Sequence, residues 1–353
     1  MRLLLLTEFL YDFSTFRLVL ENLAEIYSNH GHHVETAGQS GRRKPRSTAA
    51  PWGRIIRLAG RVPPALMDGI DAAHLHTTGY WTPVLASIDD AALSMPLVVT
   101  FQDWDNPNLP ANDSRALRRW TKLLESAAAV TAVSHGVAAR LSSSIPSIRK
   151  RVHVIPNGVD ASMFQKERPL ARGPSPFILC PARLASYKGI DLALMAWKDV
   201  SSVKNEVDLV FAGRDHARGQ FQRLARLLGL SSRTRFLGEV GRRKMRELMG
   251  SCLFAILPSR HEAFGIVALE AMAGGKAVLA TRTDGPSDVV IHGSTGLLVR
   301  PGSVDQLRDG IAALLANSRR RDLMGRKGKR RAKTFRWESI AKSYLRLYSG
   351  EKK

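Results

Sequence analysis

Short apolar runs alternate along the chain with longer stretches in which apolar residues recur at helical spacing. Short apolar or β-branched runs between turn-forming residues predict strands, and longer amphipathic stretches predict helices. In the first half, the predicted strands are residues 2–7, 32–38, 72–77, 97–101 and 129–134, with a helix over 16–30. A strand–helix–strand order favours parallel pairing, so we predict a doubly wound sheet.

The second half repeats the alternation and ends in one more helix. The predicted strands are residues 177–181, 207–212, 234–240, 252–259, 276–281 and 295–299. One helix is expected to begin near Gly189-Ile190, a second covers 266–273, and an amphipathic closing helix covers 334–348. The prolines and glycine around residue 172 predict a linker. We therefore predict an α/β chain with domains at 1–167 and 177–335, a linker at 168–176 and a C-terminal helix at 336–353.

Three segments carry local predictions of their own. Residues 40–51 are polar and basic, which predicts a flexible loop. Residues 52–61 mix isoleucines with arginines, a pattern that fits an amphipathic helix lying either in a bilayer interface or against the core. Asp284-Gly285-Pro286 predicts a turn.

Charge and cysteine content bear on partners and compartment. The net charge is +22, of which residues 1–165 carry +3 and the remainder +19. Residues 319–336 are densely basic. Solubilising surface is the ordinary explanation for such a block, and an anionic membrane is the functional one we prefer to nucleic acid, because no nucleic-acid recognition motif accompanies the charge. Cys180 and Cys252 lie in apolar runs, as reduced core thiols do.

No apolar run reaches transmembrane length, and residues 1–10 read as a first strand instead of a signal peptide. We therefore expect a cytoplasmic protein that associates with the inner face of the membrane at most peripherally.

The segment from Pro258 to Gly275 carries the strongest chemical signal. Glu262 and Glu270 flank the start of the helix predicted at 266–273, which ends at a glycine pair. A helix N-terminus offers unpaired N–H donors and a partial positive charge, which suit a phosphate. Carboxylates accept hydrogen bonds from hydroxyls. Together, these groups predict a site for a sugar phosphate.

This segment, continued over residues 252–302, resembles the donor site of the retaining glycosyltransferases of family 4. The resemblance implies the GT-B fold, in which two doubly wound Rossmann-like domains face a central cleft and a C-terminal helix returns to the first domain. It also implies hexosyl transfer from a nucleoside-diphosphate sugar, with no metal or other cofactor.

The resemblance also assigns roles to residues of the second domain. Arg183 and Lys188 would bind the diphosphate, where fixed cations stabilise the charge that develops on the leaving group. Glu262 would hold a hydroxyl of the transferred sugar, and Glu270 the ribose hydroxyls. The remaining donor contacts would come from the backbone of the following residues: Phe264, Gly265, Ile266, Gly213 and Gly238.

The acceptor side departs from the family in two places. Ser14-Thr15 stands where the family commonly has a glycine pair, which lets backbone approach a ligand closely. Gln102 precedes Asp103 where family members often have a histidine, and glutamine cannot shuttle a proton. Ser134 ends a strand near the expected acceptor site but suits a helix N-cap equally well.

Other ligand-like side chains have simpler explanations. Asp103 and Asp105 imitate a D-x-D metal motif, but the resemblance implies a metal-independent reaction. His74, His76 and His261 are expected to be structural, because their spacing does not fit a zinc site.

The function that the sequence favours is sugar transfer in cell-surface polysaccharide or glycolipid synthesis. The acceptor would be a glycan, a lipid-linked molecule or a small molecule, and no nucleic-acid partner is expected. Glycosylation of a small natural product is an alternative. A non-catalytic subunit that binds a sugar nucleotide is another, and Ser14-Thr15 and Gln102 support it.

Overall fold

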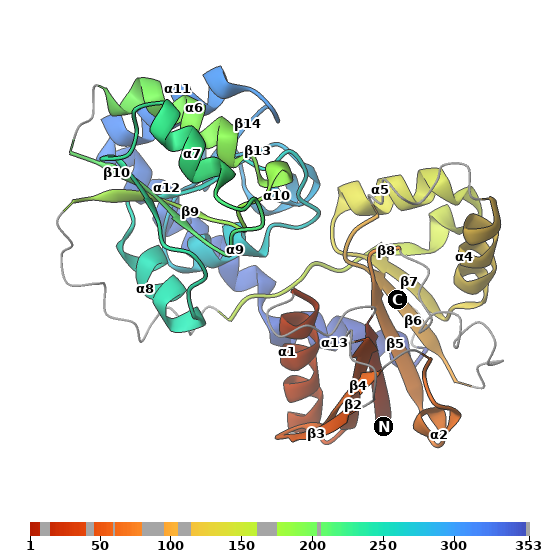
Figure 1. The fold of residues 1–353 in the computed structure, drawn as a ribbon. Coiled ribbons are helices and arrows are strands. Elements are labelled where there is room, and N and C mark those ends of the chain that lie inside the picture. Colours follow the sequence, from red (N-terminus) through yellow and green to blue (C-terminus); the bar gives the residue numbers. More distant parts are fainter. Residues whose placement is uncertain are drawn as a thin grey trace. The chain divides into compact units, whose positions relative to one another are not determined.

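The computed structural model describes residues 1–7, 15–39, 46–58, 61–79, 95–104, 114–160, 175–202 and 206–350. The chain forms two compact units (Figure 1). The first unit comprises Met1–Gly158 and Trp337–Lys353, and the second comprises Val159–Arg336. Most of the linker expected at 168–176 lies outside the described residues.

The first unit is built on one sheet with strand order β3-β4-β2-β1-β5-β6-β7-β8. All neighbouring strands are parallel except β3 and β4. The strands are β1 Arg2–Thr7, β2 His33–Gln39, β3 Arg46–Ala50, β4 Gly53–Leu58, β5 Ala72–Thr77, β6 Leu97–Phe101, β7 Ala129–Ala132 and β8 Val152–Val154. The helices are α1 Thr15–Asn29, α2 Pro64–Met67, α4 Ser114–Ser126, α5 His135–Ser144, the 3₁₀ turn η1 Pro146–Arg151 and α13 Trp337–Tyr348.

The second unit has an all-parallel sheet with strand order β11-β10-β9-β12-β13-β14. Its strands are β9 Phe177–Pro181, β10 Asp208–Ala212, β11 Thr234–Phe236, β12 Ala255–Leu257, β13 Val278–Thr281 and β14 Gly296–Val299. Its helices are η3 Ser186–Lys188, α6 Ile190–Ser201, α7 Gln220–Leu227, α8 Arg242–Ser251, α9 Ile266–Ala273, α10 Asp284–Val289, α11 Val304–Ala316, α12 Ser318–Ala332 and η4 Lys333–Phe335.

All eleven predicted strands are present, although β11 and β12 are shorter than the predicted 234–240 and 252–259. All three local predictions need correction. The described end of the expected loop 40–51 is strand β3, and residues 53–58 of the expected helix are strand β4. β4 pairs with β2, where Arg54 lies opposite the buried Glu35 and forms an ion pair with it at 2.5 Å. A strand accommodates this pattern because β-branched isoleucines fit a pleated surface. The expected turn at Asp284 is the first turn of α10.

Helix α13 is held in the first unit by a buried network of hydroxyls and one imidazole. The Tyr348 hydroxyl lies 2.5 Å from Nδ1 of His74 and 3.1 Å from the hydroxyl of Tyr27. Nε2 of His74 lies 2.7 Å from Oγ1 of Thr100, which also bonds Tyr344. Burial without a counter-charge lowers the pKa of His74 well below its ordinary value. His74 therefore has a structural role, as predicted.

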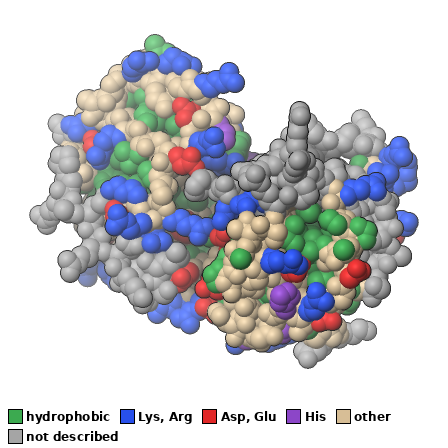
Figure 2. Space-filling view, turned by 60° about the horizontal axis from the view of Figure 1, so that its bottom comes forward, with side chains coloured by type: hydrophobic (Ala, Val, Ile, Leu, Met, Phe, Trp, Pro, Cys, Tyr) green, Lys and Arg blue, Asp and Glu red, His purple; other side chains and the backbone are tan. Residues whose placement is uncertain are grey.

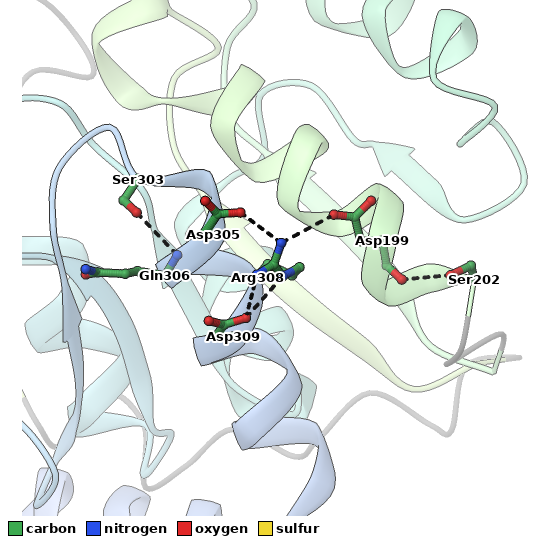
Figure 3. Close-up of polar contacts among 7 residues, drawn as sticks. All are labelled: Asp199, Ser202, Ser303, Asp305, Gln306, Arg308 and Asp309. Carbon is green, nitrogen blue, oxygen red and sulfur yellow. Dashed lines mark hydrogen bonds and ion pairs between the residues drawn. The ribbon is translucent and has the colours of Figure 1, made fainter.

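Apolar packing joins the helices α6 and α11 in the second unit. Leu307, Ile311 and Leu314 of α11 are buried in the same cluster as the apolar face of α6. On the surface beside them, Arg308 reaches toward Asp305 and Asp309 of its own helix and Asp199 of α6 (Figure 3). These carboxylates are exposed, so the ion pairs contribute little, and the buried side chains supply most of the packing energy.

Lys and Arg side chains are more frequent than Asp and Glu on the face drawn in Figure 2, in keeping with the net charge of +22. In the described part of the chain, no helix combines the length and the apolar composition that crossing a bilayer requires.

Candidate active site

Strand order places a ligand-binding position in the second unit. From β9 the chain proceeds to β10 and β11 on one side, and then returns to β12 on the other side before continuing to β13 and β14. β9 and β12 are thus adjacent strands whose connections diverge. Open α/β sheets bind ligands outside the carboxyl ends of the strands at such a switch point. The loops that follow β9 and β12 carry Lys188 and Glu262.

Lys188 and Glu262 meet directly. Nζ of Lys188 donates a hydrogen bond to Oε2 of Glu262 at 2.5 Å, and both side chains are largely buried, with 16% and 18% of their surface exposed. Glycine makes the approach feasible, because a Cβ on Gly189 would lie 2.0 Å from the carbonyl oxygen of Pro258. The site therefore presents an ammonium and a carboxylate side by side, close enough to contact one small ligand together.

Arg260 ties the two loops together. Its backbone N–H donates to the carbonyl of Tyr187 at 2.8 Å, and its Nη1 donates to the carbonyl of Ser186 at 2.8 Å. Nη1 and Nη2 also form a bidentate pair with the carboxylate of Asp191 at 2.8 and 2.6 Å. This ion pair lowers the pKa of Asp191 although burial opposes it. The turn that carries Lys188 is thus fixed relative to Glu262.

Arg183 lies on the same loop and is exposed. Its guanidinium carbon lies 5.9 Å from the centre of the Tyr187 ring, and Nζ of Lys188 lies 5.2 Å from the same centre. Among the described residues, no carboxylate pairs with Arg183. The aromatic ring therefore contacts two cations, one of which keeps its charge available to an anionic ligand.

Helix α9 begins beside this pair with an uncapped N-terminus. Gly265 adopts a left-handed conformation with φ of 84° at the N-cap, and no described side chain caps the helix. Phe264 is buried, and a Cβ on Gly285 would lie 2.0 Å from the Cα of Phe264. α10 is thus packed closely against the backbone that leads into α9. The amides at Gly265 and Ile266 are held at a fixed helix end, which attracts negative charge.

Glu270 lies on α9, one turn beyond the helix start. It is half-buried, and loss of hydration raises its pKa to about 7, although Arg242 and Arg246 of α8 act to lower it. Near neutral pH the group thus exists in both protonation states and can accept or donate a hydrogen bond.

Gly213 and Gly238 lie together at the ends of β10 and β11. The N–H of Gly213 donates to the carbonyl of Gly238 at 2.8 Å. A Cβ on Gly213 would lie 2.1 Å from the carbonyl oxygen of Ala182, so only glycine fits there. These strand ends therefore border the loop that carries Arg183 and Lys188.

Three of the acceptor-side candidates, Gln102, Asp103 and Ser134, follow the carboxyl ends of strands β6 and β7 in the first unit. Gln102 follows β6 and is buried, where its amide exchanges two hydrogen bonds with Asn157, at 2.7 and 3.2 Å, and lies 3.2 Å from Nδ1 of His76. Asp103 pairs with Arg140 at 3.1 Å. Gln102 and Asp103 are therefore held by protein partners.

Ser134 follows β7 and is the N-cap of α5, where its hydroxyl accepts a hydrogen bond from the N–H of Val137 at 3.3 Å. Ser134 thus has the helix-capping role that the sequence suggested as an alternative. Thr15 is the first residue of α1, and Ser14 and Asp105 lie outside the described residues. His76 is buried, and its Nε2 has no partner among the described residues.

Sequence reasoning did not identify Arg260 or Asp191. Arg260 stands two residues before Glu262, and Asp191 is the second residue of α6. Neither position suggests a partner, because the pairing depends on β9 and β12 being neighbours. Cys180, expected to be a reduced core residue, is free and buried, and burial raises its thiol pKa to about 12, so it is not a nucleophile.

Solved structures identify the fold. Sucrose-phosphate synthase from Thermosynechococcus elongatus superposes with a TM-score of 0.82 at 22% identity, over 99% of this chain and 98% of that one. The Anabaena protein HepE, solved in complex with UDP, superposes with a TM-score of 0.80 at 18% identity, over 99% and 100%. The fold is GT-B, as predicted.

Family models then identify the family. The model of glycosyl transferases group 1 matches residues 162–331, and that of glycosyltransferase family 4 matches residues 18–163. The chain belongs to these glycosyltransferases. An uncharacterized glycosyltransferase of Methanocaldococcus jannaschii is 30% identical over 57% of this chain and 54% of its own length. The chain spans between about half and two thirds of the length of the first curated relatives that it matches.

Proposed function

We propose that the protein is a retaining glycosyltransferase that moves a hexosyl group from a nucleoside-diphosphate sugar to an acceptor. The observation that carries the proposal is the contact between Lys188 and Glu262 beside the N-terminus of α9. A cation, a carboxylate and a helix end suit the phosphate and hydroxyl groups of such a donor. The UDP complex of the similar Anabaena protein supports this choice of ligand class.

The donor's diphosphate gains negative charge as the glycosidic bond breaks. Arg183, Lys188 and the amides at the start of α9 would stabilise that charge more strongly in the transition state than in the ground state. These groups would do the work of a metal ion, and the reaction would need no cofactor. Lys188 would exchange its contact with Glu262 for one with the diphosphate, which leaves the carboxylate to accept from a sugar hydroxyl.

The other donor groups would follow from position. Glu270 would accept hydrogen bonds from the ribose hydroxyls, and the backbone at Gly213 and Gly238 would border the nucleoside. Departure and attack on one face of the sugar, with a diphosphate oxygen taking the acceptor's proton, would retain the anomeric configuration. In that scheme Glu262 positions the donor and does not form a covalent intermediate.

The acceptor would bind the first unit near Thr15, Ser134 and Asp103. A glycan or lipid-linked acceptor in cell-surface polysaccharide or glycolipid synthesis fits the family and the basic surface, which also favours a peripheral position at the inner face of the membrane. A small natural product is the alternative acceptor.

Single substitutions test the donor-site roles. Glu262→Gln should reduce sugar transfer steeply while the melting temperature stays near that of the wild type, and Glu338→Gln on the exposed side of α13 is the matched control. Lys188→Ala should remove about 2–4 kcal/mol of transition-state stabilisation. Its control is Lys198→Ala, at the exposed far end of α6. Wild-type turnover in both site variants would rule out the assignment.

A non-catalytic subunit that binds a sugar nucleotide is the second candidate. The observation that favours it is that the amide nitrogen of Gln102 already contacts Asn157 and His76, which leaves no free N–H donor at this position for the acceptor. A panel of nucleotide sugars separates the two, since a ligand present at 100 times its Kd stabilises a protein by about 2.7 kcal/mol. Stabilisation together with product formation supports the enzyme, whereas stabilisation without transfer or donor hydrolysis supports the subunit.

A further inference from the structure

Helix α12 packs on α9 through one face that is made of small and apolar residues. Met324, Gly325, Gly328 and Ala332 are buried. A Cβ on Gly325 would lie 2.1 Å from the carbonyl oxygen of Gly275, so the two segments are in close contact. This contact fixes the rotation of α12 about its axis, and thereby decides which of its residues face away from the unit.

The outward face carries three arginines and a leucine. At about 100° per residue, Arg319, Leu323, Arg326 and Arg330 fall within an arc of about 60° opposite the buried residues. All four are exposed, and Leu323 has 43% of its surface accessible. We call these four residues the outward face of α12.

The arginines at the sides of α12 have structural partners. Nη1 of Arg321 donates to the carbonyl of Leu314 at 2.9 Å. Arg331 donates to the carbonyls of Val289 and Asp288 at 2.7 and 2.6 Å, and its guanidinium lies over the ring of Phe335. These residues hold α12 to α10 and α11, which explains their presence without any ligand.

The side chains of the three arginines of the outward face make no hydrogen bond or ion pair with any described residue. Like charges at a spacing of four, as at Arg326 and Arg330, destabilise a helix slightly. The one carboxylate of α12 is Asp322, which lies 3.9 Å from Nε of Arg321. The outward face therefore holds a helical row of uncompensated charge with an exposed leucine in its middle.

We propose that the outward face of α12 binds the surface of an anionic phospholipid bilayer. The arginines would contact lipid phosphates, and Leu323 would enter the boundary between headgroups and acyl chains. The face suits a membrane better than nucleic acid, because it has an aliphatic side chain and no aromatic residue on which a base could stack. The inference gives the peripheral membrane position proposed above a specific surface, and its test does not depend on sugar transfer.

Vesicle sedimentation is the primary experiment. The wild-type protein should bind vesicles of equal parts phosphatidylglycerol and phosphatidylcholine, and not phosphatidylcholine alone. The triple variant Arg319→Gln/Arg326→Gln/Arg330→Gln should lose about 100-fold in affinity, from about 1 kcal/mol for each basic residue at an anionic surface. The control triple variant Lys198→Gln/Arg226→Gln/Arg300→Gln removes the same charge at exposed positions elsewhere in the unit and should bind like the wild type.

A second measurement reports contact at Leu323 itself. Cys180 and Cys252 are buried, and burial raises both thiol pKa values to about 12, so Leu323→Cys provides one reactive thiol for an environment-sensitive fluorophore. Its emission should shift to the blue with anionic vesicles. Melting temperatures and sugar transfer to a soluble acceptor should be unchanged in the triple variant, which separates this inference from the proposed activity.

Three results would overturn the proposal: no binding of the wild type to anionic vesicles, an equal loss in both triple variants, or an unshifted fluorophore on bound vesicles. Retention on duplex DNA through the same arginines, without vesicle binding, would show that the outward face binds nucleic acid and not a membrane.

Discussion

Removal of the Arg260 guanidinium tests whether the link between the two loops matters for the chemistry. In Arg260→Ala the turn Ser186–Lys188 loses the side-chain hydrogen bond from Arg260 to the Ser186 carbonyl. It keeps the backbone hydrogen bond from residue 260 to Tyr187 and the contact of Lys188 with Glu262. The carboxylate of Asp191 then loses both of its bonds to Arg260. The prediction is a modest loss of stability and a larger loss of catalytic rate.

The structure sets the size of both effects. Arg260 and Asp191 have 41% and 26% of their side chains exposed, so their pair contributes no more than about 1 kcal/mol. The bond to the carbonyl of Ser186 adds about 1 kcal/mol, and the sum is about 2 kcal/mol of unfolding free energy. A displacement of Lys188 by about 1 Å would reduce the rate by about 10²-fold, because in the proposed mechanism the ammonium must meet the leaving diphosphate.

Urea unfolding and steady-state kinetics measure the two effects on the same samples. A double-mutant cycle with Asp191→Asn should give a coupling energy of about 0.5–1 kcal/mol. Arg260→Lys should recover some stability but little of the rate, since lysine lacks the bidentate fork. The reduction should fall on kcat more than on KM. Arg300→Ala, on an exposed loop, is the control. A measurable coupling energy with wild-type kcat in Arg260→Ala would refute the positioning role.

Three further predictions concern stability and pH. Gly285→Ala should destabilise the second unit by at least 2 kcal/mol in urea unfolding, because the added Cβ would lie 2.0 Å from the Cα of Phe264; Gly250→Ala, in open space within α8, should be neutral or stabilising. The pKa of Glu270 is about 7 in the folded protein, against an ordinary value of 4.5, so the folded state holds this proton more tightly than the unfolded state. The free energy of unfolding should therefore fall as the pH rises from 4.5 to 7. An equally steep fall in Glu270→Gln would contradict this prediction. Burial lowers the pKa of His76 to about 3, so the free energy of unfolding should fall as the pH drops from 6.5 toward 3. The difference in unfolding free energy between pH 7.5 and pH 4.5 should shrink in His76→Gln. An unchanged difference in this variant would exclude His76 as its source.

The sequence predicted those parts of the site that depend on local signals. Helix α9 begins and ends where expected, because Gly265 and the pair Gly274-Gly275 allow conformations that other residues adopt at a cost. Lys188 and Glu262 both follow short apolar strands, so their meeting required only that these strands be adjacent. The strand order of the structure meets that condition.

Features that depend on pairing across the fold could not be predicted in this way. Residues 53–58 are too few to distinguish a strand from a helix by periodicity, and the ion pair that favours the strand joins Arg54 to a residue on β2. Arg260 and Asp191 are 69 positions apart, and nothing in either segment marks the other as its partner. Contacts of this kind become visible only with the register and order of the strands.

The basic block at residues 319–336 shows how far composition can be interpreted. The sequence establishes its density, and both a solubilising surface and a membrane contact fit that density equally well. What distinguishes them is the rotation of α12, which depends on Gly325 and Gly328 packing closely on the turn at Gly275 and on Met272. That rotation directs Arg321 and Arg331 to neighbouring carbonyls and leaves three other arginines in a row with Leu323. The orientation of the helix thus decides which charged side chains can contact a partner. Their number is smaller than the net charge suggests.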